Sequence, residues 1–159
     1  FSTVHTNSAA ATITRLVDMG IEPFLVSSTI LGVLAQRLIR RVCPQCRKSY
    51  APHPEQVREL GVSKARIQKA GGRFFRGQGC EHCRETGYRG RLGVHELLVM
   101  TEPVKAAVLE SADANFIQRS ALKDGMITMR KDGTSKVLRG LTTPEELLSI
   151  TSDAESGGN

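Results

Sequence analysis

The 159-residue chain is long enough for one hydrophobic core, or for one core with a small lobe, and shows no internal repeat. Its net charge is +6 at pH 7, and aromatic residues make up only 4 % of it, with no Trp. The scarcity of aromatic residues argues against a protein that binds nucleic acid by stacking bases. No apolar run reaches the roughly 18 residues of a transmembrane helix.

The positive charge is concentrated in the middle of the chain. From Arg37 to Arg91 there are fourteen Lys and Arg against four Asp and Glu, an excess of ten, whereas the remainder has an excess of four negative charges. Two interpretations stay open. The region is a solvated surface, or it binds an acidic partner or anionic lipid headgroups, to which each basic side chain contributes about 1 kcal/mol.

The first residues predict a strand followed by a helix. Phe1–Val4 has strand character with no turn before it, so we expect the chain to be cut from a longer polypeptide. The polar turn 5–7 follows, and Asn7 or Ser8 is expected to cap a helix that ends just before Gly20.

The next segment predicts a helix and then a strand. Pro23 suits the first turn of a helix that extends to about Leu31. Residues 32–43 could continue this helix, but the spacing of Leu34 and Val42 favours a strand.

All four cysteines lie in two short pairs, Cys43-Pro-Gln-Cys46 and Cys80-Glu-His-Cys83. This spacing lets two thiolates reach one ion at about 2.3 Å. Thirty-three residues separate the pairs, more than in a compact zinc ribbon. The pattern predicts a structural zinc ion, with four thiolates, that closes an inserted lobe. Two disulfides or free thiols are the alternatives, and His82 is interpreted as a bystander.

The cysteine pairs also predict how the lobe is attached. Short helices are expected at about 54–60 and 63–70, and a long strand at 88–100. One pair ends the strand before the lobe, and the other nearly opens the strand after it. If the two strands are antiparallel neighbours, their ends meet at the metal, and zinc takes the place of a tight turn.

Everything after residue 100 predicts helices. Thr101 begins one helix, Asp113 caps the next, and a third runs from Thr128 to Gly140. Residues 142–146 are a strong start for a last helix, with a proline and two acids in the first turn. The small and polar tail, 152–159, is expected to be disordered.

At this point the chain resembles the ATPases of bacterial secretion and pilus assembly. FSTVHTNSAAATITRLVDMG resembles their histidine-box segment, EPFLVSSTILGVLAQRLIRRVCPQC and GCEHCRETGYRGRLGVHELL their tetracysteine element, and MRKDGTSKVLRGLTTPEEL their last helices. Among these ATPases the type II secretion ATPase is most similar and the type IV pilus extension ATPase comes second. Retraction-type members, which lack the four cysteines, fit poorly.

The resemblance implies an α/β fold, the C-terminal and here incomplete portion of a RecA-like ATPase domain, with an inserted zinc-binding lobe and a C-terminal helical bundle. The implied domains are 1–42 for the core with the histidine box, 43–83 for the lobe, 84–100 for a returning core strand, and 101–151 for the helical subdomain. A homo-hexamer is implied, cytoplasmic and peripheral on the bacterial inner membrane. It would bind platform proteins and anionic lipids, and no nucleic acid.

The resemblance also implies ATP and magnesium as cofactors of the full-length protein. No G-x-x-x-x-G-K-[ST] motif occurs here, so we expect the missing motifs upstream and no ATP hydrolysis by this chain alone. His5 is assigned to phosphate sensing and catalysis by resemblance, and Thr3, His5, Thr6 and Asn7 to nucleotide contact, the threonines and Asn7 serving as positioning residues. Glu96, inside an apolar strand, is expected to face solvent or to pair with an Arg such as Arg37.

Two other classes of function stay open. A zinc-ribbon module that binds nucleic acid would explain the basic lobe, but neither the long loop between the pairs nor the helical tail. A purely structural oligomerisation domain would have no nucleotide-sensitive role for His5.

Overall fold

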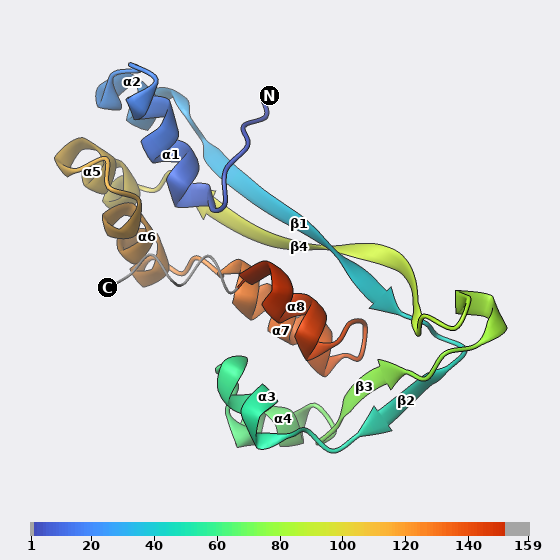
Figure 1. Cartoon of the computed structure of the whole chain (residues 1–159). Coiled ribbons are helices and arrows are strands. Elements are labelled where there is room, and N and C mark those ends of the chain that lie inside the picture. Colours follow the sequence, from blue (N-terminus) through green and yellow to red (C-terminus); the bar gives the residue numbers. More distant parts are fainter. Residues whose placement is uncertain (1, 152–159) are drawn as a thin grey trace. The chain divides into compact units, whose positions relative to one another are not determined.

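The computed structural model describes residues 2–151, and their course is shown in Figure 1. Within these residues the chain forms two compact units. Unit 1 contains residues 2–36 and 95–129, and unit 2 contains residues 37–94 and 130–151. The domain limits implied by the resemblance stay a prediction, and the expected disordered tail lies outside the described residues.

Unit 1 holds four helices, α1 (Ala9–Asp18), α2 (Pro23–Thr29), α5 (Glu102–Glu110) and α6 (Ala114–Lys123). Two of the expected caps are present. The Ser8 hydroxyl accepts a hydrogen bond from the amide of Ala11 at 3.2 Å, and the Asp113 carboxylate accepts one from the amide of Phe116 at 2.8 Å. Each cap satisfies an amide that the first helical turn leaves without a partner.

These helices bury one continuous apolar cluster. Its largest fully buried side chains are Ile13, Leu98 and Ile117, with Val26, Val104 and Val108 beside them. The expected strand at the start of the chain is wrong for the described residues 2–4, which have no regular structure. The two sheets of the described chain, β1-β4 and β2-β3, do not include them. These residues thus lack a ladder of backbone hydrogen bonds, without which strand propensity does not hold an extended segment.

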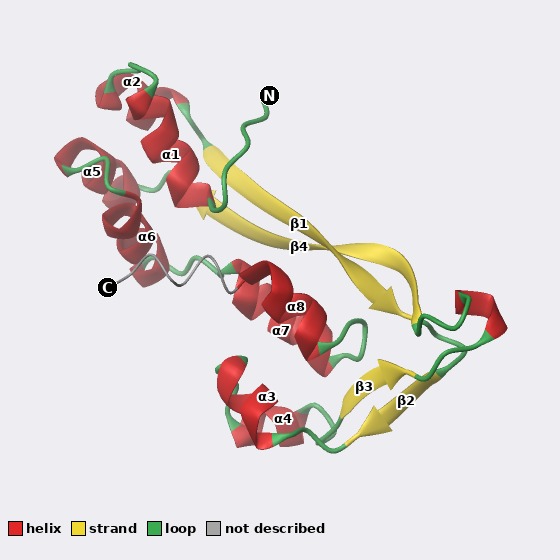
Figure 2. Cartoon of the chain, in the orientation of Figure 1, coloured by secondary structure: helices red, strands yellow, loops and turns green. Residues whose placement is uncertain are grey.

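Strands β1 (Gly32–Val42) and β4 (Tyr88–Val99) pair with each other and run through both units. The amide of Met100 donates to the carbonyl of Leu31 at 3.1 Å, and the amide of Cys43 to the carbonyl of Gly87 at 2.9 Å. The start of one strand therefore meets the end of the other, so the pair is antiparallel, as the opposed arrows in Figure 2 show. Both predicted strands are confirmed.

Unit 2 places the segment between the cysteine pairs in short elements. These are β2 (Arg47–Tyr50), α3 (Pro54–Glu59), α4 (Lys64–Lys69), β3 (Phe74–Gly77) and the 3-10 helix η1 (Glu81–Cys83). The two helices were predicted, whereas β2 and β3 were not. These strands pair antiparallel, with Arg47 opposite Gly77 and Tyr50 opposite Phe74.

Helices α7 (Met129–Leu138) and α8 (Pro144–Thr151) complete the described chain, and both agree with the predicted helices. In unit 2 they share an apolar cluster with the lobe, made of Leu60, Val62, Ile67, Phe74, Val137, Leu138 and Leu147. Among residues 2–151, none of the helices has the length and apolar character needed to cross a membrane.

Candidate metal centre

The four cysteine sulfurs converge in unit 2. Cys43 directly follows β1 and Cys46 directly precedes β2, while Cys80 stands before η1 and Cys83 ends it. The four sulfur atoms all lie within 4.8 Å of one another. The sequence spacing therefore predicted a cluster that folding does assemble, at the tip of the β1-β4 pair.

The distances between the sulfurs fit one tetrahedral ion. The Sγ atoms of Cys43 and Cys80 are 3.9 Å apart, those of Cys46 and Cys83 3.9 Å, and those of Cys80 and Cys83 3.7 Å. Four sulfurs at about 2.3 Å from a zinc ion lie about 3.8 Å from one another in a tetrahedron, whereas disulfide sulfurs lie about 2.05 Å apart. All four cysteines are free, so the donor set suits a zinc ion.

Backbone amides point at the sulfur of Cys83. The amide of Gly87 donates to it at 3.2 Å and that of Cys80 at 3.3 Å. Burial raises the pKa of the Cys83 thiol, but these amides and the neighbouring thiols outweigh it and lower the pKa to about 7. For Cys80 a backbone hydrogen bond lowers the pKa of the thiol. Burial and hydrogen bonds with the other three thiols outweigh this effect and raise the pKa to about 11. The backbone amides therefore favour negative charge on the sulfur of Cys83, whereas the neighbouring thiols oppose it on the sulfur of Cys80.

Two glycines allow the backbone to close around the centre. A Cβ on Gly77 would lie 2.0 Å from the carbonyl oxygen of Gly87, and a Cβ on Gly87 would lie 2.8 Å from the carbonyl oxygen of Gly77. Gly87 also has φ +76°, which L side chains rarely adopt. Only glycine at both positions lets β3 approach the loop that carries the amide donor to Cys83.

The loop between α7 and α8 supports the strands on which the centre is built. The amide of Val42 donates to the carbonyl of Leu141 at 2.9 Å. Arg47 donates to the carbonyl of Gly140 at 3.3 Å, and its guanidinium lies 4.2 Å from the centre of the Phe75 ring. Arg47, which directly follows the first cysteine pair, is thereby held by both a polar and an aromatic contact.

The expected nucleotide residues lie in unit 1, in the segment that leads into α1. The Thr6 hydroxyl bonds to the carbonyl of Ser8 at 3.2 Å and to the hydroxyl of Thr12 at 2.6 Å, which suits a positioning residue. Thr3, His5 and Asn7 are exposed. Their contact with a nucleotide stays a prediction.

Glu96 lies on the buried face of β4. It is 4 % exposed, so the expectation that it faces solvent is wrong, whereas the alternative, a pairing with an Arg such as Arg37, stays a prediction. One carboxylate oxygen accepts a hydrogen bond from the amide of Ala9 at 3.0 Å, and the other accepts one from the amide of Met129 at 3.4 Å. These are the first residues of α1 and α7, so one buried carboxylate caps two helices.

Comparison with known proteins agrees with these features. The family described as "Type II/IV secretion system protein" matches residues 1–149. The type IV pilus assembly ATPase PilB of Thermus thermophilus is 49 % identical over 150 residues, which are 94 % of this chain and 17 % of PilB. The type II secretion system protein E of Dickeya dadantii is 47 % identical over 152 residues, 96 % of this chain and 29 % of that protein.

A second type II secretion system protein E, from Aeromonas hydrophila, is 48 % identical over 153 residues, 94 % of this chain and 29 % of that protein. The chain thus spans less than a third of the length of these relatives. Since the family match covers nearly every residue, from the histidine-box segment through the thiol cluster to α8, the chain belongs to the type II/IV secretion system protein family.

Proposed function

We propose that the chain is part of an ATPase that drives protein export through a type II secretion system. The observation that carries this proposal is the 47 % and 48 % identity, over at least 94 % of the chain, to type II secretion system protein E of two bacteria. ATP and magnesium are assigned in this proposal to the full-length protein, and this chain, which contains no P-loop, is not expected to hydrolyse ATP alone.

In this proposal Cys43, Cys46, Cys80 and Cys83 hold a structural zinc ion. The ion would offset part of the negative charge of the four thiolates and join the ends of the lobe, 43–83, to the β1-β4 pair. The distances of 3.7–3.9 Å between sulfurs and the amide donors to Cys83 support this assignment. Residues 1–42 and 84–100 would belong to a RecA-like core and residues 101–151 to a helical subdomain.

His5 acts on the terminal phosphate in this proposal, and Thr3, Thr6 and Asn7 position it. An exposed imidazole can donate a hydrogen bond toward a phosphate or respond to its loss. The bond between Thr6 and Thr12 supports a fixed course of the backbone on entering α1.

The assembled protein is a homo-hexamer in this proposal, peripheral on the cytoplasmic face of the inner membrane and bound to platform proteins and anionic lipids. Unit 1 exposes large apolar side chains, among them Phe24 at 68 % and Leu31 at 89 %. Apolar surface of this kind supports burial in a larger assembly. The excess of ten positive charges between residues 37 and 91 supports an acidic partner surface.

Type IV pilus assembly is a second candidate function. It is favoured by the 49 % identity to the pilus assembly ATPase PilB over 94 % of the chain. The two candidates share a family and a motor chemistry, and they differ in the machine that the motor drives.

Chimeric proteins can separate the two candidates. This chain would replace the matching segment of protein E in Dickeya dadantii and of PilB in Thermus thermophilus. We expect the first chimera to restore secretion and the second to leave pilus assembly impaired, because the platform contacts of this chain would fit the secretion system. Protein E carrying the matching PilB segment is the control.

Pilus assembly without secretion would reverse the proposal in favour of the second candidate. Loss of both activities, with each chimera folded and able to hydrolyse ATP, would reject both. Secretion restored as well by the PilB segment as by this chain would show that the segment does not select the machine.

A further inference from the structure

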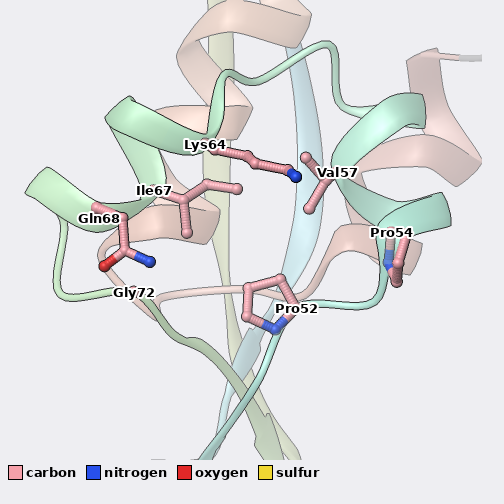
Figure 3. Close-up of a pocket in the computed structure, with 7 residues that line it drawn as sticks. All are labelled: Pro52, Pro54, Val57, Lys64, Ile67, Gln68 and Gly72. Carbon is pink, nitrogen blue, oxygen red and sulfur yellow. The ribbon is translucent and has the colours of Figure 1, made fainter.

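The lobe of unit 2 contains an apolar pocket between α3 and α4. Its space is about 280 Å³, and Pro52, Pro54, Val57 and Ile67 supply its apolar lining. Figure 3 shows Val57 and Ile67 on opposite sides of the pocket and Pro52 below them. The side chain of Ile67 is buried and that of Val57 is half-buried, so both belong to the wall as well as to the apolar cluster of the unit.

Two exposed polar side chains stand at the same pocket. Figure 3 shows the amine of Lys64 reaching toward Val57, and the amide of Gln68 on the next turn of α4. Within the described chain, neither side chain makes a hydrogen bond or an ion pair. The pocket therefore offers an apolar cavity together with an ammonium group and an amide at its edge.

We propose that this pocket is a docking site for an acidic peptide segment of a partner protein, which inserts an aliphatic side chain between Val57 and Ile67. The volume supports a side chain, since about 280 Å³ lies below the roughly 300–1,000 Å³ of sites for small molecules and cofactors. A carboxylate beside the inserted side chain pairs with Lys64. This proposal does not depend on the role in secretion.

The charge around the pocket selects an acidic partner. From Pro52 to Arg73, the part of the chain that lines the pocket, there are five basic residues and two acidic ones, Glu55 and Glu59. Complementary charge speeds association and rejects basic segments, whereas the buried aliphatic contact supplies the larger part of the affinity.

The shape of the lobe favours a peptide over a membrane surface. A protein that inserts into a bilayer presents protruding apolar side chains. None of the large apolar residues that the described chain exposes lies between residues 43 and 87. The apolar surface of the lobe is concave there, and it fits a side chain that the partner supplies.

Nuclear magnetic resonance of the zinc-loaded, 159-residue chain tests this proposal with a synthetic peptide, acetyl-EDLLEE-amide. We expect the methyl signals of Val57 and Ile67 to shift and to saturate with a Kd below about 1 mM. EDSSEE has the same charge without the aliphatic side chains, and KKLLKK has the aliphatic side chains with opposite charge. Neither should shift these methyl signals.

Two matched variants test whether the ammonium group of Lys64 pairs with the carboxylate of the peptide. Lys64→Glu should weaken EDLLEE binding by about fivefold, as expected for one exposed ion pair. Lys69→Glu makes the same change at the other end of α4, at a residue that does not line the pocket, and should leave the Kd within about twofold. Amide spectra of both variants report whether the lobe stays folded.

Three results would overturn the proposal. The first is the absence of methyl shifts, or equal shifts with EDSSEE, which would leave only diffuse charge attraction. The second is an equal loss of affinity in the Lys64 and Lys69 variants. The third is a set of methyl shifts produced by phosphatidylglycerol vesicles instead of the peptide, which would assign the pocket to a membrane.

Discussion

Arg40 joins several segments of unit 2 through different kinds of contact. Its guanidinium donates twice to one carboxylate oxygen of Glu146, at 2.9 and 2.5 Å, and its amide donates to the other oxygen at 3.0 Å. The guanidinium also lies 4.2 Å from the centre of the Tyr88 ring. The carbonyl of Arg40 accepts a bond from the hydroxyl of Thr142 at 2.9 Å. Since Glu146 stands in the first turn of α8, these bonds fix α8 to β1.

The pH dependence of this contact can be predicted. Hydrogen bonds from the Arg40 side chain hold the pKa of Glu146 below its ordinary value of 4.5, although burial opposes them. A carboxyl whose pKa falls on folding stabilises the fold above its unfolded pKa and loses that effect as the pH drops through the folded pKa. Glu146→Gln should therefore lower the free energy of unfolding at pH 7 by about 1 kcal/mol, since Arg40 is 58 % exposed and water screens the pair.

Denaturant unfolding as a function of pH measures this effect. The difference between Glu146→Gln and the unchanged chain should shrink as the pH falls from 4.5 through the lower pKa that Glu146 has in the folded chain, below which Glu146 is neutral in both states. Glu102→Gln is the control, since Glu102 is 86 % exposed in its pair with Lys105. A difference that stays constant down to about pH 3 would contradict a role for the carboxylate charge.

Glu96 shows why the exposure of one residue could not be predicted in a strand that was itself predicted correctly. The apolar residues of β4 occupy both of its faces, since Val94 and Leu98 are buried, whereas Leu97 and Val99 are 53 % and 51 % exposed. Alternation alone does not show which face is covered. Glu96 shares the face of Val94 and Leu98, and the amides that it caps come from residues far away in the sequence.

At the scale of elements, the helices and the long strands were predictable because their signals are local. Caps such as Ser8 and Asp113, and the prolines in first turns, mark helix starts that the structure confirms. Strands β2 and β3 carry no such signal, since each has four residues and β2 contains Arg47 and Lys48. The tertiary arrangement brings them together, with the cysteine pairs next to one end of each.

Metal removal is expected to act on the lobe and to leave unit 1 unchanged. The chain should carry one zinc ion, and a chelator should raise amide hydrogen exchange across residues 43–87. Without the ion no metal bond joins the two cysteine pairs, and the lobe contributes only a small apolar cluster around Phe74 and Ile67. Helices α5 and α6 bury their residues in the cluster of unit 1, so their exchange should not change. Zinc well below one equivalent in reduced protein would contradict the assignment.

The close approach of Gly77 to Gly87 gives a sharper test of the lobe and its metal centre. Gly77→Ala places a Cβ 2.0 Å from the carbonyl oxygen of Gly87, which is backbone and cannot rotate away. We expect this change to destabilise the lobe by about 1–3 kcal/mol and to speed loss of zinc to a chelator, because it displaces the amide that donates to Cys83.

Gly61→Ala is the matched control for this test. Gly61 also lies in the lobe, with φ +60° and no atom within 4 Å of an added Cβ. It should cost about 1 kcal/mol through its backbone conformation without faster zinc loss. Equal rates of zinc loss in both variants would show that the approach of Gly77 to Gly87 does not support the metal centre.

At the scale of the whole molecule, the chain matches only part of its relatives, 17 % of PilB and 29 % of protein E. The sequence predicted the cysteine cluster because every ligand lies within this chain. A role for His5 is harder to predict from structure, since the phosphate that it is proposed to contact would be held by a P-loop, which this chain does not contain.

The role proposed for His5 can be tested in the protein E chimera, which we expect to supply such a motif. His5→Ala should lower kcat for ATP hydrolysis by about 100-fold and change KM for ATP by less than about threefold, as expected for a group that acts mainly in the transition state. Steady-state kinetics and nucleotide binding measure the two effects separately. His53→Ala is the matched control, since His53 is also exposed but lies before α3 in the lobe. Equal losses of binding and turnover in His5→Ala would indicate a binding or folding role, and equal losses in both variants would remove the histidine box from the mechanism.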